Sequence, residues 1–173
     1  MLGKLLGAGL ILGCSSYAGW QVAGAYARRP VQLRDLQTAL AVLQTEIEYG
    51  ATPLPEALAS AARAGGPAVG AIFRATAERL AAGGGNTPGD AMREALADQS
   101  GSTALRPGDL SIVAALAEVL GATGRADQVR HLSLARERLA GEEARAADER
   151  ARYERMARYL GVLGGAALVL IFI

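Results

Sequence analysis

The sequence predicts an all-α protein, a bundle of about six helices flanked by an N-terminal and a C-terminal transmembrane helix. Apolar residues recur at steps of three and four between breaks rich in Gly and Pro. No stretch shows the period-two alternation of a half-buried strand. Both ends of the chain are apolar and uncharged. The predicted domains are a membrane helix over 1–27, a cytoplasmic helical domain over 28–158 that ends in a charged stalk, and a membrane helix over 159–173.

The N-terminal segment from Leu5 to Ala27 carries no charge and exceeds the roughly 20 residues that a membrane-spanning helix needs. Small residues at helical spacing allow two helices to approach closely in lipid. We therefore expect the two membrane helices to pack on each other or on another subunit, unless these residues merely reflect a chain rich in Gly and Ala. The residues predicted to make this contact are Gly9, Gly13, Ser16, Gly161 and Gly165.

A different interpretation of the N-terminus is a cleaved signal. Lys4 and the apolar run that ends at Cys14 resemble a secretory or bacterial lipoprotein signal. The chain would then be a cleaved or lipid-anchored helical protein on the extracytoplasmic side, with a binding role. The apolar run continues well past Cys14, which neither signal requires, and this favours the membrane helix.

Arginines at the inner ends of the two apolar segments predict the topology. Arg28, Arg29 and Arg34 follow the first segment, and four arginines from Arg150 to Arg158 precede the last one. Since positively charged flanks remain in the cytoplasm, residues 28–158 are expected inside and both termini outside. The segment 159–173 is short for a bilayer, so Met156 is expected to be submerged as well.

The first helix of the central domain is expected after Pro30, which predicts a kink or a new helix start where the chain leaves the membrane. An apolar stripe then runs along one face, and Gly50 ends the helix. The stripe consists of Leu33, Leu36, Leu40, Leu43 and Ile47.

Three further helices follow, separated by Gly-rich breaks. Thr52 is expected to cap the first of these helices. Thr87, which is followed by Pro88 and Asp90, is expected to cap the last one. The breaks are 65–67 and 83–86, and the middle helix carries Val69, Ile72 and Phe73.

A loop over 101–108 precedes the fifth helix, which Gly121 and Gly124 close. The last helix is expected from about Ala126 to the C-terminus, with Val129, Leu132, Ala135 and Leu139 facing the core. Beyond Leu139 it becomes polar on all sides, which predicts a solvated stalk with Asp148–Arg152 and Glu154–Arg158 ion pairs. Gly141 is its weak point.

No constellation in the sequence predicts catalysis. Asp127 and His131 share a helix face but lack further metal ligands, and Glu142 with Glu143 shows no sign of the burial that acid–base chemistry needs. We expect no catalytic residue, cofactor or metal, although an enzyme with an unrecognised helical site remains an alternative. A net charge of +1 argues against nucleic-acid binding, and a single Cys excludes an internal disulfide.

Several blocks resemble stage III sporulation protein AB, a family of endospore-forming bacteria, and the resemblance spans the whole chain. The blocks are Arg29-Pro30-x-Gln32-Leu33-Arg34, Glu46-Ile47-x-Tyr49-Gly50-x-Thr52-Pro53-Leu54-Pro55-Glu56-Ala57-Leu58, and Leu120-Gly121-x-x-Gly124-Arg125-x-Asp127-Gln128-x-x-His131.

The resemblance implies a scaffold in the channel, or feeding tube, between mother cell and forespore, located in the mother-cell membrane around the forespore. Its cytoplasmic part would be similar to the platform protein of type II secretion and type IV pilus machines. Implied partners are a cytosolic ATPase like stage III sporulation protein AA, other membrane proteins of the assembly, the lipid bilayer and a second copy of the chain. Predicted partner-contact residues are Arg125, Asp127, Gln128, His131, Glu46 and Tyr49, although Arg125 and Asp127 are also suited simply to start and cap the last helix.

Overall fold

The computed structural model describes the backbone of residues 2–172 except residues 51, 84 and 86, and the side chains of residues 24, 27–50, 52–83, 85 and 87–157. Within this part every regular element is helical, which confirms the predicted all-α class. The elements are α1 (Leu2–Tyr49), α2 (Leu54–Ala64), α3 (Gly66–Ala81), α4 (Pro88–Gln99), the short 3₁₀ helix η1 (Ser100–Ser102), α5 (Pro107–Ala117) and α6 (Arg125–Phe172).

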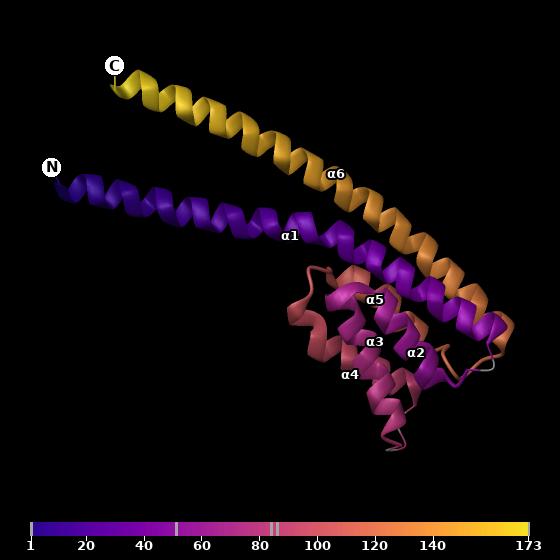
Figure 1. Cartoon of the computed structure of the whole chain (residues 1–173). Helices are drawn as coiled ribbons and strands as arrows, with labels where there is room; N and C mark the ends of the chain where they lie inside the picture. Colours follow the sequence, from indigo (N-terminus) through magenta and orange to yellow (C-terminus); the bar gives the residue numbers. More distant parts are fainter. Residues whose placement is uncertain (1, 51, 84, 86, 173) are drawn as a thin grey trace.

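Two long antiparallel helices, α1 and α6, pack side by side, and α2 to α5 form a compact group against the C-terminal part of α1 (Figure 1). Each helix of this group contacts the next one along the chain, and α5 reaches α6. The group therefore packs mainly on α1, and α5 also ties it to α6.

The core follows the predicted apolar stripes. Leu33, Leu36, Leu40 and Leu43 of α1 are fully buried, and Leu132 and Leu139 of α6 are buried in the same cluster. Val129, which was expected in the core, is only half-buried. The shorter helices contribute the other large buried side chains, among them Leu58, Val69, Ile72, Phe73, Met92 and Val113.

One of the two predicted threonine caps is confirmed. The Thr87 hydroxyl accepts a hydrogen bond of 3.1 Å from the backbone N–H of Asp90 at the start of α4. Thr52 does not cap α2, since Pro53 occupies that position and the Thr52 hydroxyl instead donates to Glu46 over 2.9 Å. The loop expected over 101–108 is also shorter, because η1 and the first turn of α5 occupy part of it.

Neither Pro30 nor Gly141 interrupts a helix. Pro30 lies inside α1, so of the two predicted alternatives, a kink or a new helix start, the second is wrong, and Gly141 lies inside a continuous α6. A proline in a helix interior removes one backbone hydrogen bond, which here is tolerated where Pro30 is buried against its surroundings.

The two predicted membrane helices are not tested by the described side chains. Among the residues that could be searched, no helix is both long and apolar enough to cross a bilayer. Most of the first apolar segment and all of the second lie outside the described side chains, as do Gly9, Gly13, Ser16, Gly161 and Gly165.

Two glycines in helix interiors make opposite predictions for substitution by Ala. A Cβ at Gly70 would lie 2.4 Å from the backbone oxygen of Ala62, because α2 and α3 approach closely there, whereas a Cβ at Gly141 meets nothing within 4 Å. We expect Gly70→Ala to lower the free energy of unfolding by about 1–3 kcal/mol through overpacking. Gly141→Ala should raise it by about 1 kcal/mol because Ala favours the helix. Thermal unfolding of the purified full chain measures both, and a stabilising Gly70→Ala would contradict the close approach.

Candidate partner-contact site

A buried ionic cluster joins α1, α5 and α6. Arg29 of α1 is only 4% exposed, and its Nε and Nη2 donate to the two carboxylate oxygens of Asp109 over 2.9 and 2.8 Å. Nη2 also donates to Glu142 of α6 over 2.9 Å. Asp109, 1% exposed, additionally accepts a 2.8 Å bond from the backbone N–H of Arg106 at the start of α5. One guanidinium thus fixes three helices.

The charges in the cluster are held by each other. Burial would raise the pKa of Asp109, but the bonds from Arg29 and from the Arg106 backbone outweigh it, so the pKa of this carboxyl lies below its ordinary value. Hydrogen bonding to Asp109 likewise raises the pKa of Arg29. Asp109 has a lower pKa in the folded protein than in the unfolded chain, so its ionised form stabilises the fold at pH values above the unfolded pKa. This stabilisation is lost as the pH falls through the lowered pKa of the folded state.

Further ion pairs surround the cluster. The carboxylate of Glu149 on α6 accepts a hydrogen bond of 3.0 Å from Nη1 of Arg106. The same carboxylate lies 3.7 Å from Nη1 of Arg29. Glu143 accepts bonds from Arg34 and, over 2.7 Å, from Gln37, both on α1. The stretch 142–149 is therefore not the solvated stalk that the sequence predicted, because Glu142, Glu143 and Glu149 bind groups on α1 or at the start of α5.

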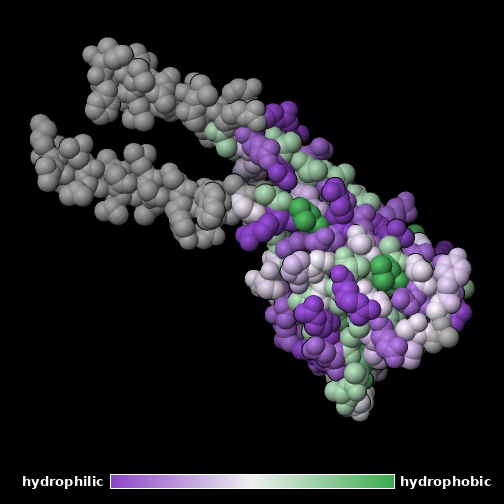
Figure 2. Space-filling view, viewed as in Figure 1, coloured by the Kyte–Doolittle hydropathy of each residue, from purple (hydrophilic) through white to green (hydrophobic). Residues whose placement is uncertain are grey.

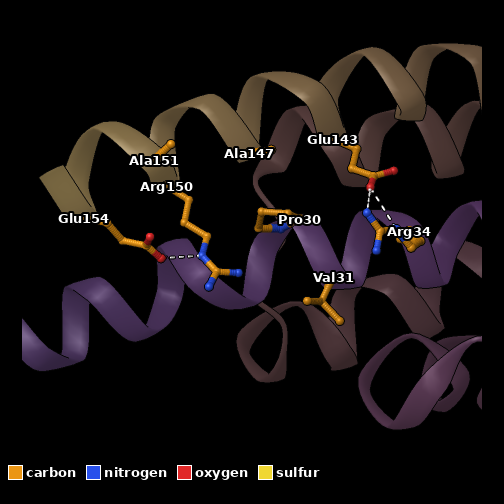
Figure 3. Close-up of a pocket in the computed structure, with 8 residues that line it drawn as sticks. All are labelled: Pro30, Val31, Arg34, Glu143, Ala147, Arg150, Ala151 and Glu154. Atoms are coloured by element: carbon orange, nitrogen blue, oxygen red, sulfur yellow. Dashed lines mark hydrogen bonds and ion pairs between the residues drawn. The ribbon is translucent and has the colours of Figure 1, made fainter.

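This pairing leaves a shallow groove of about 300 Å³ between α1 and α6. In Figure 3 the Arg34–Glu143 and Arg150–Glu154 pairs lie toward its two ends, with Pro30 and Val31 of α1 between them. Arg150 bonds Glu154 over 2.8 Å, whereas no pair joins Asp148 to Arg152 among the described side chains. Of the two predicted stalk pairs, the first is therefore wrong, and the second involves Arg158, whose side chain is not described.

The cluster has a signal in the periodicity of the sequence. Extending the apolar stripe of α1 backwards by four residues from Leu33 leads to Arg29. Extending the stripe of α6 beyond Leu139 at steps of three and four leads to Glu142, Ala146 and Glu149. The cluster therefore occupies the same seam as the core leucines. Arg29, which we had read as a membrane flank in water, is buried because Asp109 and Glu142 meet it there.

The predicted partner-contact residues lie at the opposite end of the α1–α6 pair. Glu46 and Tyr49 end α1, and the segment from Arg125 to His131 begins the antiparallel α6 beside it (Figure 1). A 3.1 Å bond from Arg136 to Gln44 links the two helices close to this end. We call these six residues the tip: Glu46, Tyr49, Arg125, Asp127, Gln128 and His131.

Side chains of the tip are largely available to a partner. Tyr49 is 79% exposed, which is unusual for a large aromatic side chain. Arg125, Asp127 and His131 are also exposed, while Gln128 is half-buried and donates to the Thr123 carbonyl over 2.8 Å. Asp127 lies in the first turn of α6, where an acid suits the helix dipole, so it also serves the helix start.

The tip has no arrangement suited to catalysis or metal binding. Within the described part of the chain, no three His, Cys, Asp or Glu side chains lie close enough to hold a metal ion. The visible face of the domain is mostly hydrophilic with scattered apolar residues (Figure 2). The tip presents one exposed aromatic ring among charged groups.

The Arg29 cluster predicts a sharp contrast between two ion pairs. Arg29→Met should lower the free energy of unfolding by about 3–5 kcal/mol, because it leaves Asp109 and Glu142 without their buried partner. Arg34→Met removes an exposed pair and should cost at most about 1 kcal/mol.

Adding Asp109→Asn to Arg29→Met should recover part of the loss, since the Asn oxygen still accepts the Arg106 N–H and no charge remains there. Denaturant unfolding of the four proteins measures this, and equal losses for Arg29→Met and Arg34→Met would contradict the buried cluster.

Comparisons with known proteins agree with the resemblance noted in the sequence. The family model for stage III sporulation protein AB matches residues 4–173. Stage III sporulation protein AB of Bacillus subtilis (strain 168) is 33% identical over 168 residues, which cover 97% of this chain and 98% of that protein. A solved structure of a stage III sporulation protein AB superposes with a TM-score of 0.66 at 30% identity, over 72% of this chain and 97% of that one. With nearly its full length matched, the chain belongs to the stage III sporulation protein AB family.

Proposed function

We propose that this protein is a non-enzymatic membrane platform of the channel assembly between mother cell and forespore. It couples a cytosolic ATPase of the secretion type to the membrane components of the assembly. The observation that carries the proposal is the polarity of the α1–α6 pair: the tip lies at one end, and both helices continue toward the uncharged terminal segments from the other.

The membrane end of this proposal rests on sequence and helix direction. Because α1 and α6 are antiparallel, Arg28 and Arg155 lie at the same end of the pair, next to the two apolar segments. A single membrane therefore suits both segments, with residues 28–158 in the cytoplasm and both termini outside.

The partner end rests on the tip. It combines two sequence blocks that are far apart in the chain, 46–49 and 125–131, into one exposed surface. Protein interfaces are enriched in aromatic residues and arginine, and Tyr49 and Arg125 fit that composition. A surface at the greatest distance from the membrane end is also the one that a cytosolic ATPase reaches first.

The proposed topology predicts which positions a membrane-impermeant maleimide labels. In a Cys14→Ser background, Ser102→Cys lies on the exposed η1 segment and should stay unlabelled in intact protoplasts but react after permeabilisation. Gly3→Cys should react in both. Labelling of Ser102→Cys in intact protoplasts would contradict the cytoplasmic location. A mature N-terminus at Cys14 would instead support the lipid-anchored alternative.

The proposed ATPase contact predicts a loss of binding from tip substitutions. Tyr49→Ser and Asp127→Arg should each weaken binding of the full chain to a stage III sporulation protein AA-like ATPase by about tenfold, as expected for a residue inside an interface. Glu78→Arg, on an exposed face of α3 away from the tip, is the matched control and should bind normally.

Thermal unfolding should be unchanged in Tyr49→Ser and Glu78→Arg, because these side chains are exposed. Asp127→Arg should be slightly less stable, by at most about 1 kcal/mol, because it reverses a charge in the first turn of α6. Unchanged binding by both tip variants would exclude the tip as the contact, and no binding by the unsubstituted chain would exclude the ATPase as a direct partner.

A further inference from the structure

Exposed apolar side chains gather at the end of the α1–α6 pair opposite the tip. Val31 of α1 is 53% exposed, and Tyr153 and Met156 of α6 are 38% and 52% exposed. Val31 lines the same groove as Arg150 and Glu154, and Tyr153 and Met156 are within two residues of Glu154 along α6. Elsewhere in the described part of the chain, only Tyr49 and Leu134 are large apolar residues with such exposure.

The arginines at this end differ from those just above it. Arg29, Arg34, Arg106 and Arg150 each bind an acid. In contrast, Arg28, Arg152 and Arg155 form no ion pair among the described side chains, and Arg28 and Arg155 bond only backbone carbonyls, those of Gly24 and Ala151. Two nearby acids are already paired, Glu154 with Arg150 and Glu149 with Arg106, and within the described part of the chain Asp148 forms no ion pair with Arg152. Three guanidinium groups therefore remain available to an external anion.

We propose that this end is a binding surface for the headgroups of anionic phospholipids. The surface, which we call the collar, consists of Arg28, Val31, Arg152, Tyr153, Arg155 and Met156. The inference rests on the proposed membrane location and deepens it by naming the lipid class that the domain contacts.

Two arguments select a lipid surface as the occupant. Both helices continue from the collar into uncharged apolar segments, so a bilayer interface is the environment next to it. A guanidinium matches a phosphate oxygen pair in geometry and charge, and tyrosine is favoured at the headgroup level, where its ring and hydroxyl meet different surroundings. In Figure 2 strongly hydrophilic residues alternate with paler apolar ones on the last described turns of α6, the mixture that an interface requires.

The anionic headgroup is favoured over the zwitterionic one by charge. Phosphatidylcholine offers a phosphate together with its own cation, whereas phosphatidylglycerol offers net negative charge. Each arginine close to an anionic membrane surface raises the equilibrium constant for contact with that surface by about fivefold. Salt screens this attraction beyond the Debye length, which is about 10 Å at 0.1 M.

The test reconstitutes the full chain in phosphatidylcholine vesicles and measures, with spin-labelled lipids, the preference of the protein surface for phosphatidylglycerol over phosphatidylcholine. We expect a preference of about fivefold at low salt that largely disappears near 1 M salt. The triple variant Arg28→Gln, Arg152→Gln and Arg155→Gln should reduce it by at least half, with Arg158 as the arginine that remains next to the last apolar segment. The control variant Arg63→Gln, Arg74→Gln and Arg138→Gln removes the same charge from exposed positions outside the collar and should retain the preference.

A wild-type chain without the preference, or a triple variant that retains it, would overturn the proposal. Loss of a membrane protein partner in the triple variant with unchanged lipid preference would mean that the collar binds protein instead, and would overturn it too. Extraction with carbonate separates the two levels: a chain that washes off the vesicles refutes the membrane platform itself, whereas a chain that remains without lipid preference refutes only the collar.

Discussion

The ionic cluster around Arg29 determines how the two long helices lie against each other. The seam between α1 and α6 is built from aliphatic residues that repeat at steps of three and four, such as Leu36, Leu40 and Leu43 of α1 and Leu132 and Leu139 of α6. A repeat of this kind permits more than one register, because a shift by one turn again brings apolar residues together. Arg29 removes that freedom, since only one register supplies both Asp109 and Glu142. Buried ion pairs contribute little net stability compared with apolar packing, so register is the property that this cluster adds.

The same register assembles the tip. Glu46 and Tyr49 belong to α1, and Arg125 to His131 belong to α6, so their spacing depends on how the two helices are aligned. A slip of one helical turn, about 5.4 Å, would separate the two halves of the proposed partner surface. Several helical turns separate the cluster from the tip. Over this distance buried leucines and the Arg136–Gln44 hydrogen bond hold α1 and α6 together. A buried interaction near the membrane end therefore supports a contact surface at the far end.

The sequence predicted the helices well and the ionic seam poorly, for a physical reason. Apolar periodicity and the Thr87 cap are local signals, and both are present in the structure. Thr52 failed as a cap because Pro53 takes the N-cap position of α2, while the Thr52 hydroxyl donates to the Glu46 carboxylate across the turn. Pro30 failed as a helix start because packing of a long helix outweighs one lost backbone bond. Arg29 and Asp109 are 80 residues apart, and nothing local to either indicates the other. The two sides of the tip, in contrast, came from sequence blocks, and antiparallel packing of α1 and α6 brings them to one end.

The charges of α6 are distributed so that one helix meets two different surroundings. Read alone, its second half is polar on every side, which is why it resembled a solvated stalk. In the structure Glu142 and Glu149, seven residues apart, lie on the inner side with Ala146 and face arginines of α1 and α5. Arg138 and Arg152, each separated by seven residues from Arg145, lie on exposed positions. Acids pointing inward are neutralised within the domain, so the outward surface toward the membrane end is left with a surplus of guanidinium groups. The inward-facing acids that define the register thus leave unpaired arginines on the described surface, and these arginines are the basis of the proposed contact with an anionic bilayer.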